Sequence, residues 1–107
     1  MKKITDRQQA QHDVENNYRE TPMYNEGKPA FKGYGEKSNP FPATICASIN
    51  NEVVHGIPSD EKILKEGDVL KVDIGMEYKG FFVDMARTFA IGKISYAVQN
   101  LISVTEQ

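Results

Sequence analysis

Two aspartates inside one predicted β-hairpin constrain this chain more than any other feature of its sequence. The run from Val69 to Gly92 is rich in strand-forming residues, and the turn signal Tyr78-Lys79-Gly80 divides it into two strands. Each strand contains one acidic residue, Asp73 in the first and Asp84 in the second, although aspartate is disfavoured in strands. Two such residues in paired strands need a common explanation.

The turn decides how the two aspartates face each other. A loop of residues 78–79 places Asp73 directly opposite Asp84. A type I′ loop of residues 79–80, which ends in glycine, instead pairs Asp73 with Ala86. Because side chains alternate across a strand, both registers put the two carboxylates on one face of the sheet. Like charges this close repel, so one carboxylate must stay protonated unless a cation binds between them.

A bound divalent cation is the simplest relief of that repulsion. Aspartate oxygens suit cations such as Mn²⁺, Fe²⁺, Co²⁺ or Zn²⁺, and the imidazole of His55 suits the later ones. Two metals that share a bridging carboxylate activate water and polarise a carbonyl, which is hydrolytic chemistry. The structural alternative is that both aspartates cap turns or pair with Lys71 and Arg87.

Length, charge and composition limit the class of protein. The 107 residues allow one small domain, and 13 basic against 15 acidic residues give a net charge of −2, which predicts neither a nucleic-acid nor a membrane surface. The single cysteine, Cys46, cannot form an intrachain disulfide, and no apolar run reaches the roughly 18 residues of a membrane helix. We therefore expect a soluble, cytoplasmic protein without nucleic-acid or membrane partners.

The rest of the chain predicts helices and short strands around the hairpin. Residues 5–20 have a helix-capping start and a thin apolar stripe, and residues 22–42 are a proline- and glycine-rich loop. Ala43–Ile49 and Glu52–His55 have the composition of short strands. The apolar spacing of Tyr96–Thr105 predicts a second helix.

Five sequence blocks resemble type I methionine aminopeptidases, which are pita-bread metallopeptidases. The blocks are Lys28–Tyr34, Pro42–Asn50, Glu52–Pro58, Leu64–Asp68 and Asp73–Phe89. The hairpin block alone is less specific, because prolidase-like relatives have similar strings. The runs Cys46-Ala-Ser-Ile-Asn50 and Val54-His-Gly-Ile-Pro58 separate the methionine enzyme from those relatives.

This resemblance implies a role for each candidate site residue. Asp73 would chelate one metal ion and Asp84 would bridge two, and His55 would bind the substrate near the scissile amide and assist proton transfer. The residues that would line the pocket for the methionine side chain are His55, Cys46, Phe41, Tyr34 and Phe31. The resemblance also implies two divalent metal ions per complete site (Co, Mn, Fe or Zn) and the N-terminal methionine of nascent proteins as substrate. Without the resemblance, His55 and Cys46 remain open to structural roles.

The resemblance further implies that the site is incomplete. The family's other ligands, a histidine and two glutamates, come from the second half of its domain. After Asp84 this sequence has no histidine, and Glu106 is its only carboxylate. We therefore expect the chain to be inactive alone. The alternatives are a prolidase-like relative, or a non-catalytic half-domain that binds a peptide, a complementary second half or a second copy.

The fold class expected from the resemblance is α+β. The chain would form about one half of a pita-bread (creatinase/aminopeptidase-like) domain, an antiparallel sheet with flanking helices. Residues 1–27 would be an N-terminal helix and linker, and residues 28–107 would be the N-terminal half of the catalytic domain.

Overall fold

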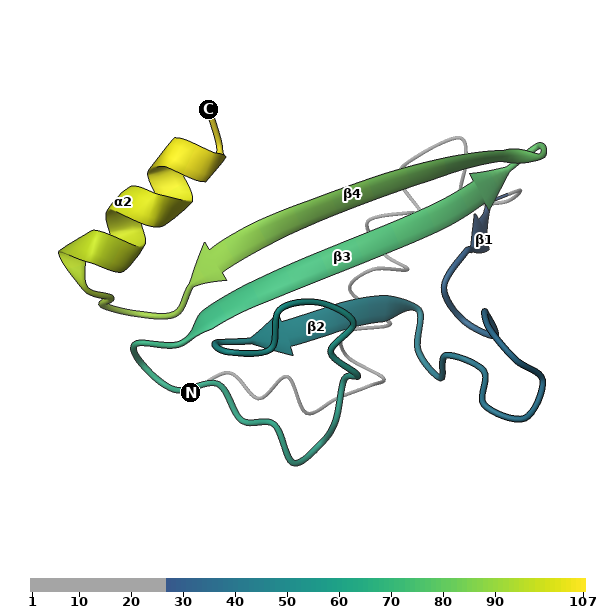
Figure 1. The fold of residues 1–107 in the computed structure, drawn as a ribbon, viewed down its shortest axis with the longest axis horizontal. Coiled ribbons are helices and arrows are strands. Elements are labelled where there is room, and N and C mark those ends of the chain that lie inside the picture. The colour runs from purple at the N-terminus through teal and green to yellow at the C-terminus, as the bar shows by residue number, and fades with distance from the viewer. Residues whose placement is uncertain (1–26) are drawn as a thin grey trace.

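The computed structural model describes residues 27–107, which form an antiparallel four-stranded sheet and one helix (Figure 1). The elements are β1 (Lys28–Pro29), β2 (Ile45–Ile49), β3 (Val69–Tyr78), β4 (Phe81–Ala90) and α2 (Tyr96–Thr105). The long β3–β4 hairpin forms one side of the sheet, and β1 and β2 both pair with the other side of β3. The helix expected over residues 5–20 lies outside the described residues.

The hairpin turn consists of residues 79–80, the second of the two loops that the sequence allowed. Both residues have positive φ angles, 51° and 81°, as a type I′ turn requires. In the resulting register Asp73 pairs with Ala86, and Asp84 pairs with Gly75. The two aspartates therefore lie on one face of the hairpin, offset by two residues along it.

Side chains of β2 and β3 alternate between a core face and a face that carries the aspartates. On the core face Ala47 pairs with Val72, and the small core cluster consists of Ala47, Leu64 and Leu70 with Ile49, Val72 and Ile91 packed against it. On the other face Cys46 pairs with Asp73. Because directly paired residues share a face, the register of β2 brings the thiol beside the first aspartate.

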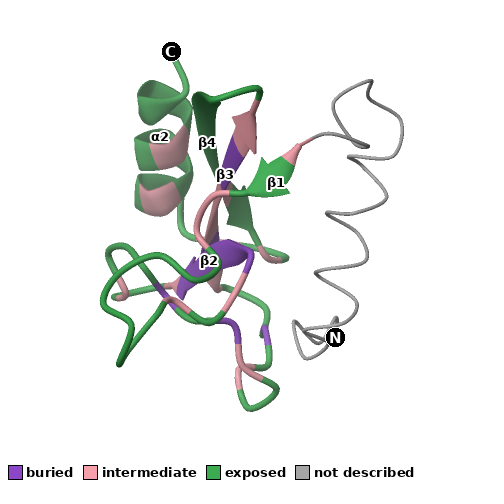
Figure 2. Ribbon diagram, turned by 90° about the vertical axis from the view of Figure 1, so that its right-hand side faces the viewer, coloured by how far each residue is buried: buried purple, intermediate pink, exposed green. Residues whose placement is uncertain are grey.

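Neither β4 nor α2 contributes a buried residue to this core. Figure 2 shows buried positions on β2 and β3, whereas β4 and α2 are mostly exposed. The large apolar side chains of β4 are solvent-accessible, including Phe81 (76% exposed), Phe82 (71%) and Met85 (69%). Within the described part of the chain, β3 is the only strand that pairs with β4. The hairpin therefore presents an apolar surface and an open strand edge.

Two further expected elements, besides the hairpin, are confirmed. The strand expected over residues 43–49 is β2, which begins two residues later, at Ile45. The helix expected over residues 96–105 is α2, and the Ser95 hydroxyl caps it by accepting a hydrogen bond from Val98 N–H at 3.3 Å. Within residues 27–107, no helix is long and apolar enough to cross a membrane.

The strand expected over Glu52–His55 is wrong, because these residues form a loop. The side-chain ammonium of Lys71 donates hydrogen bonds to the backbone carbonyls of Asn50 and Glu52. Asn50 has a positive φ of 52°. A β-branched composition predicted a strand here, but a cation from a neighbouring strand satisfies the backbone instead.

Candidate functional site

One cavity brings together every site residue predicted from the sequence. It has a volume of about 570 Å³, and the predicted residues that line it are Phe31, Tyr34, Phe41, Cys46, His55, Asp73 and Asp84. They come from the loop before β2, from β2, from the loop after it and from both strands of the hairpin. Distant parts of the chain therefore converge on one site, and the roles of its residues remain predictions.

Asp73 and Asp84 are the acidic groups of this cavity. Burial raises the pKa of Asp73, the neighbouring Asp84 carboxylate raises it further, and His55 acts in the opposite direction. The Oδ1 atom of Asp73 is buried and has no hydrogen-bond partner. Both the repulsion and the unsatisfied oxygen would be relieved by a cation.

The alternative that the aspartates serve turns or ion pairs is wrong for the described residues. Both lie inside strands, so they cap no turn. Lys71 donates to backbone carbonyls, and the Arg87 guanidinium lies 5.6 Å from the centre of the Phe89 ring. Within the described part of the chain, neither Asp73 nor Asp84 forms an ion pair with lysine or arginine. No such cation therefore neutralises the pair there.

His55 is held beside the aspartates in a left-handed backbone conformation. Its φ angle is 59°, a region that costs a non-glycine residue on the order of 1–3 kcal/mol and persists only where the surroundings impose it. Its side chain is exposed at the cavity wall, and its charge acts on Asp73. His55 also lines a second cavity, of about 1120 Å³, that extends to α2. The imidazole is thus accessible to a ligand in either space.

The aromatic side of the site depends on a glycine in β3. A Cβ at Gly75 would lie 2.4 Å from Cε1 of Phe31, so the ring packs directly on the strand backbone. Two hydrogen bonds of 2.8 Å close the loop that carries this ring, from Gly33 N–H to the Phe41 carbonyl and from Phe41 N–H to the Tyr34 carbonyl. Tyr34 is 78% exposed, which places it at the mouth of the cavity.

Cys46 contributes a small buried thiol to the cavity wall. The residue is 5% exposed. Burial raises the pKa of the thiol, and the charges of Asp73 and Asp84 raise it further. The group therefore stays protonated at neutral pH and offers a neutral, polarisable surface. Such a surface suits an apolar or thioether side chain.

The donor set fits a metal ion in part. Asp73 and Asp84 supply hard oxygen ligands on one face, and one of these oxygens is buried without a partner. Within residues 27–107, no group of three or more His, Cys, Asp or Glu side chains is arranged to hold a metal ion. The described residues therefore offer a partial ligand shell, whereas tight sites use at least three protein ligands.

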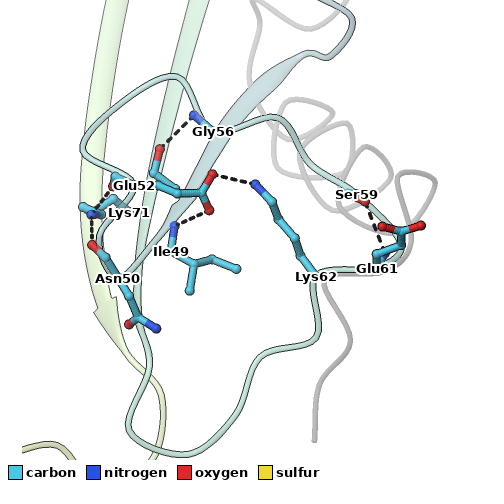
Figure 3. Close-up of polar contacts among 9 residues, drawn as sticks. Ile49, Asn50, Glu52, Gly56, Ser59, Glu61, Lys62 and Lys71 are labelled. Carbon is cyan, nitrogen blue, oxygen red and sulfur yellow. Dashed lines mark hydrogen bonds and ion pairs between the residues drawn. The ribbon is translucent and has the colours of Figure 1, made fainter.

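Sequence reasoning missed three residues that shape the site. Gly75 makes room for Phe31, and a glycine inside a strand is a recognised signal of close approach. Ser48 and Lys71 hold the loop that leads to His55, and Figure 3 shows the contacts of Lys71 with Asn50 and Glu52. Nothing in the local sequence distinguishes Ser48 and Lys71 from ordinary strand residues, because their contacts lie several residues away along the chain.

Known proteins resemble this chain in sequence. The model of metallopeptidase family M24 matches residues 2–107. A methionine aminopeptidase from Clostridium acetobutylicum is 54% identical over 79 residues, which cover 74% of this chain and 30% of the relative. A methionine aminopeptidase from Borreliella burgdorferi is 47% identical over 81 residues, which cover 76% of this chain and 30% of the relative.

Solved structures resemble it in fold. The crystal structure of methionine aminopeptidase from Thermotoga maritima has a TM-score of 0.69 at 44% identity and covers 75% of this chain and 30% of that one. The enzyme from Rickettsia prowazekii has a TM-score of 0.70 at 33% identity and covers 92% of this chain and 35% of that one. The chain therefore spans about a third of the length of the relatives it matches.

These matches confirm two expectations from the sequence. The neighbours in fold are methionine aminopeptidases, so the antiparallel sheet is part of a pita-bread domain. The resemblance of the sequence blocks to that enzyme group holds over most of the chain. With the family model matched from residue 2 to residue 107, the chain belongs to metallopeptidase family M24.

Proposed function

We propose that this chain is part of a metal-dependent aminopeptidase that removes the initiator methionine from nascent proteins in the cytoplasm. The observation that carries the proposal is the convergence of Asp73, Asp84 and His55 on one cavity with aromatic and thiol walls. The relatives above bear the name methionine aminopeptidase, which supports this enzyme over a prolidase-like relative. The proposed cofactors are two divalent metal ions, drawn from Co, Mn, Fe and Zn.

Each group in the cavity has a proposed task. Asp73 and Asp84 would hold the metal ions, Asp84 as the bridging ligand, and the bound ions would supply an activated water and Lewis acidity at the scissile carbonyl. His55 would hydrogen-bond the peptide near the scissile amide and transfer a proton there. Cys46 and the aromatic residues of the 31–41 loop would bind the flexible methionine thioether.

Asp84→Asn should remove most of the divalent-metal binding of the chain. Because the described ligand set is partial, the parent chain should bind Mn²⁺ only weakly. Losing the bridging carboxylate should weaken this binding at least about tenfold. Calorimetry measures the affinity for Mn²⁺. Broadening of the His55 and Cys46 NMR signals by Mn²⁺ shows whether the ion binds at the cavity that these residues line.

Asp60→Asn is the matched control for this experiment. Asp60 is an exposed aspartate that does not line the cavity, so its loss changes the net charge equally and should leave Mn²⁺ binding unchanged. If Asp84→Asn binds Mn²⁺ as tightly as the parent chain, the proposed metal role of the hairpin is wrong.

A second candidate is a non-catalytic half-domain that binds a partner through β4. The exposed Phe81, Phe82 and Met85 on a strand with one open edge favour it. The partner in this non-catalytic role would be a second copy of the chain, whereas a complementary second half that brings the remaining ligands would complete the enzyme proposed above. Self-pairing predicts about twice the chain mass of 12.0 kDa by light scattering, and Met85→Lys should return the monomer.

The two possible partners give different results. If the parent chain and Met85→Lys are both monomers at high concentration, pairing with a second copy is excluded. Methionine release that appears only when a complementary second half is added, and only with Co²⁺ or Mn²⁺, supports the enzyme assembled from two parts. Peptide binding that persists in a metal chelator, without cleavage, supports the non-catalytic role.

A further inference from the structure

We propose that Ser48 is a positioning residue for His55 and acts through the backbone of Gly56. Ser48 is 3% exposed, and its Oγ accepts a hydrogen bond of 2.9 Å from Gly56 N–H. That N–H belongs to the peptide bond that joins His55 to Gly56, so the hydrogen bond fixes the peptide plane next to the histidine Cα. The inference rests on the proposed function only for the task that His55 performs.

The next peptide group of the loop is held by the same strand. The Gly56 carbonyl accepts a hydrogen bond of 2.8 Å from Ala47 N–H. A Cβ on Gly56 would lie 2.3 Å from the Ala47 carbonyl oxygen, so the two backbones are in direct contact. Of these contacts, the Ser48 hydroxyl is the one that a side-chain substitution can remove without touching the loop.

The other end of the loop is anchored independently. Lys71 donates to the Glu52 carbonyl, and the Glu52 carboxylate forms a 2.8 Å ion pair with Lys62. Figure 3 shows these contacts at the start of the loop and the hydrogen bond of Gly56 at its end. His55 lies between the anchored ends, which explains how its left-handed φ of 59° is maintained.

The anchoring strands are also the strands that carry the site. Ser48 pairs with Lys71 in the β2–β3 ladder, two residues along from the pair of Cys46 and Asp73. All four side chains share one face because the ladder alternates with period two. Tying the histidine to this rigid pair of strands holds the imidazole at a set position relative to the carboxylates, which is what a proton-transferring group requires.

NMR spectroscopy of the metal-free 107-residue chain tests this role. In Ser48→Ala the Gly56 amide should exchange with solvent at least about tenfold faster, because its buried acceptor is gone. The chemical shifts of the His55 imidazole should change at the same time, because the histidine backbone is no longer held in place beside the cavity. Ser48→Thr keeps the hydroxyl and should restore both signals, while the amides of the hairpin stay unchanged in both variants.

Controls separate positioning from general stability. Ser103→Ala is the matched control, because that hydroxyl donates to the Gln99 carbonyl in α2 and should leave His55 unaffected. Where Ser48→Ala does not fold, Ser48→Cys replaces it, since a thiol of similar size is a weak acceptor and predicts the same two changes.

Two outcomes overturn the proposal. One is a His55 imidazole whose chemical shifts are unchanged in Ser48→Ala or Ser48→Cys. The other is a loss of protection throughout the hairpin that Ser48→Thr does not reverse, which would mean that the serine only stabilises the sheet. Neither readout uses a metal or a substrate, so the result is independent of the Mn²⁺ experiment on Asp84→Asn.

Discussion

Gly56→Ala should lower the free energy of unfolding by about 3 kcal/mol, a large effect for one added methyl group. The new Cβ would lie 2.3 Å from the Ala47 carbonyl oxygen and 2.8 Å from the Ser48 Cα, both backbone atoms of β2. These atoms cannot retreat without breaking the β2–β3 ladder. The total free energy of unfolding of a native domain is roughly 5–15 kcal/mol. The urea concentration at the midpoint of unfolding should therefore fall markedly.

Gly75→Ala is the matched control for steric overlap. Its Cβ would lie 2.4 Å from an atom of the Phe31 ring, a side chain that can rotate away, so we expect a loss of only about 1 kcal/mol. The displaced ring should instead open the aromatic side of the cavity and weaken binding of a methionine-containing peptide. Equal losses of stability in the two alanine variants would contradict the distinction between backbone and side-chain contacts.

Asp73→Asn should stabilise the metal-free chain and at the same time abolish the metal binding proposed for it. In the parent chain, burial and the Asp84 carboxylate both disfavour an ionised Asp73. Asparagine has nearly the same shape without the charge, so the free energy of unfolding should rise by an amount on the order of 0.5–1 kcal/mol at neutral pH. Urea denaturation in a chelator measures the gain, and Mn²⁺ calorimetry measures the loss.

The stability gained in Asp73→Asn should depend on pH. The pKa of Asp73 is raised above its ordinary value of 3.8, so the folded state binds the proton more tightly than the unfolded state. Its contribution to stability is complete below pH 3.8 and is lost as the pH rises through the raised value. The stability difference between Asp73→Asn and the parent chain should therefore grow across this range and then level off.

The comparison between the two proteins isolates Asp73 from other titrating groups. Glu52 titrates with the opposite sign, because its hydrogen bond with Lys62 lowers its pKa and its contribution is lost as the pH falls. That contribution is common to both proteins and cancels in the difference. A lower stability of Asp73→Asn at neutral pH would mean that the aspartate makes favourable contacts when ionised.

Local sequence patterns were enough for the hairpin, for β2 and for α2. The glycine in the turn and the strand-forming runs predicted β3 and β4, and Ser95 marked the start of α2. The shared face of the two aspartates also followed from the sequence, since it holds in either register. Composition and spacing within each segment predict these features, although β2 itself pairs with a strand that is distant in the chain.

The loop after β2 shows where local patterns fail. Val53 and Val54 predicted a strand, but their side chains are 78% and 62% exposed and the backbone around them forms a loop. The loop conformation is stabilised by Lys71 of the next strand, β3, whose ammonium donates hydrogen bonds to the backbone carbonyls of Asn50 and Glu52. Strand propensities describe single residues and do not include a hydrogen bond from a lysine on another strand, so they could not predict this loop.

The sequence by itself predicted a set of candidate site residues, which the structure brings to one cavity, and indicated the family that they resemble. Alternation along two strands placed Asp73 and Asp84 together, and the blocks around them indicated a methionine aminopeptidase. Only the tertiary structure decided the turn register, the packing of Phe31 on Gly75 and the loop geometry of His55. The sequence left both turn registers open, while the packing of Phe31 and the loop geometry of His55 depend on contacts between segments distant in the chain, which leave no periodic signal in the amino-acid sequence.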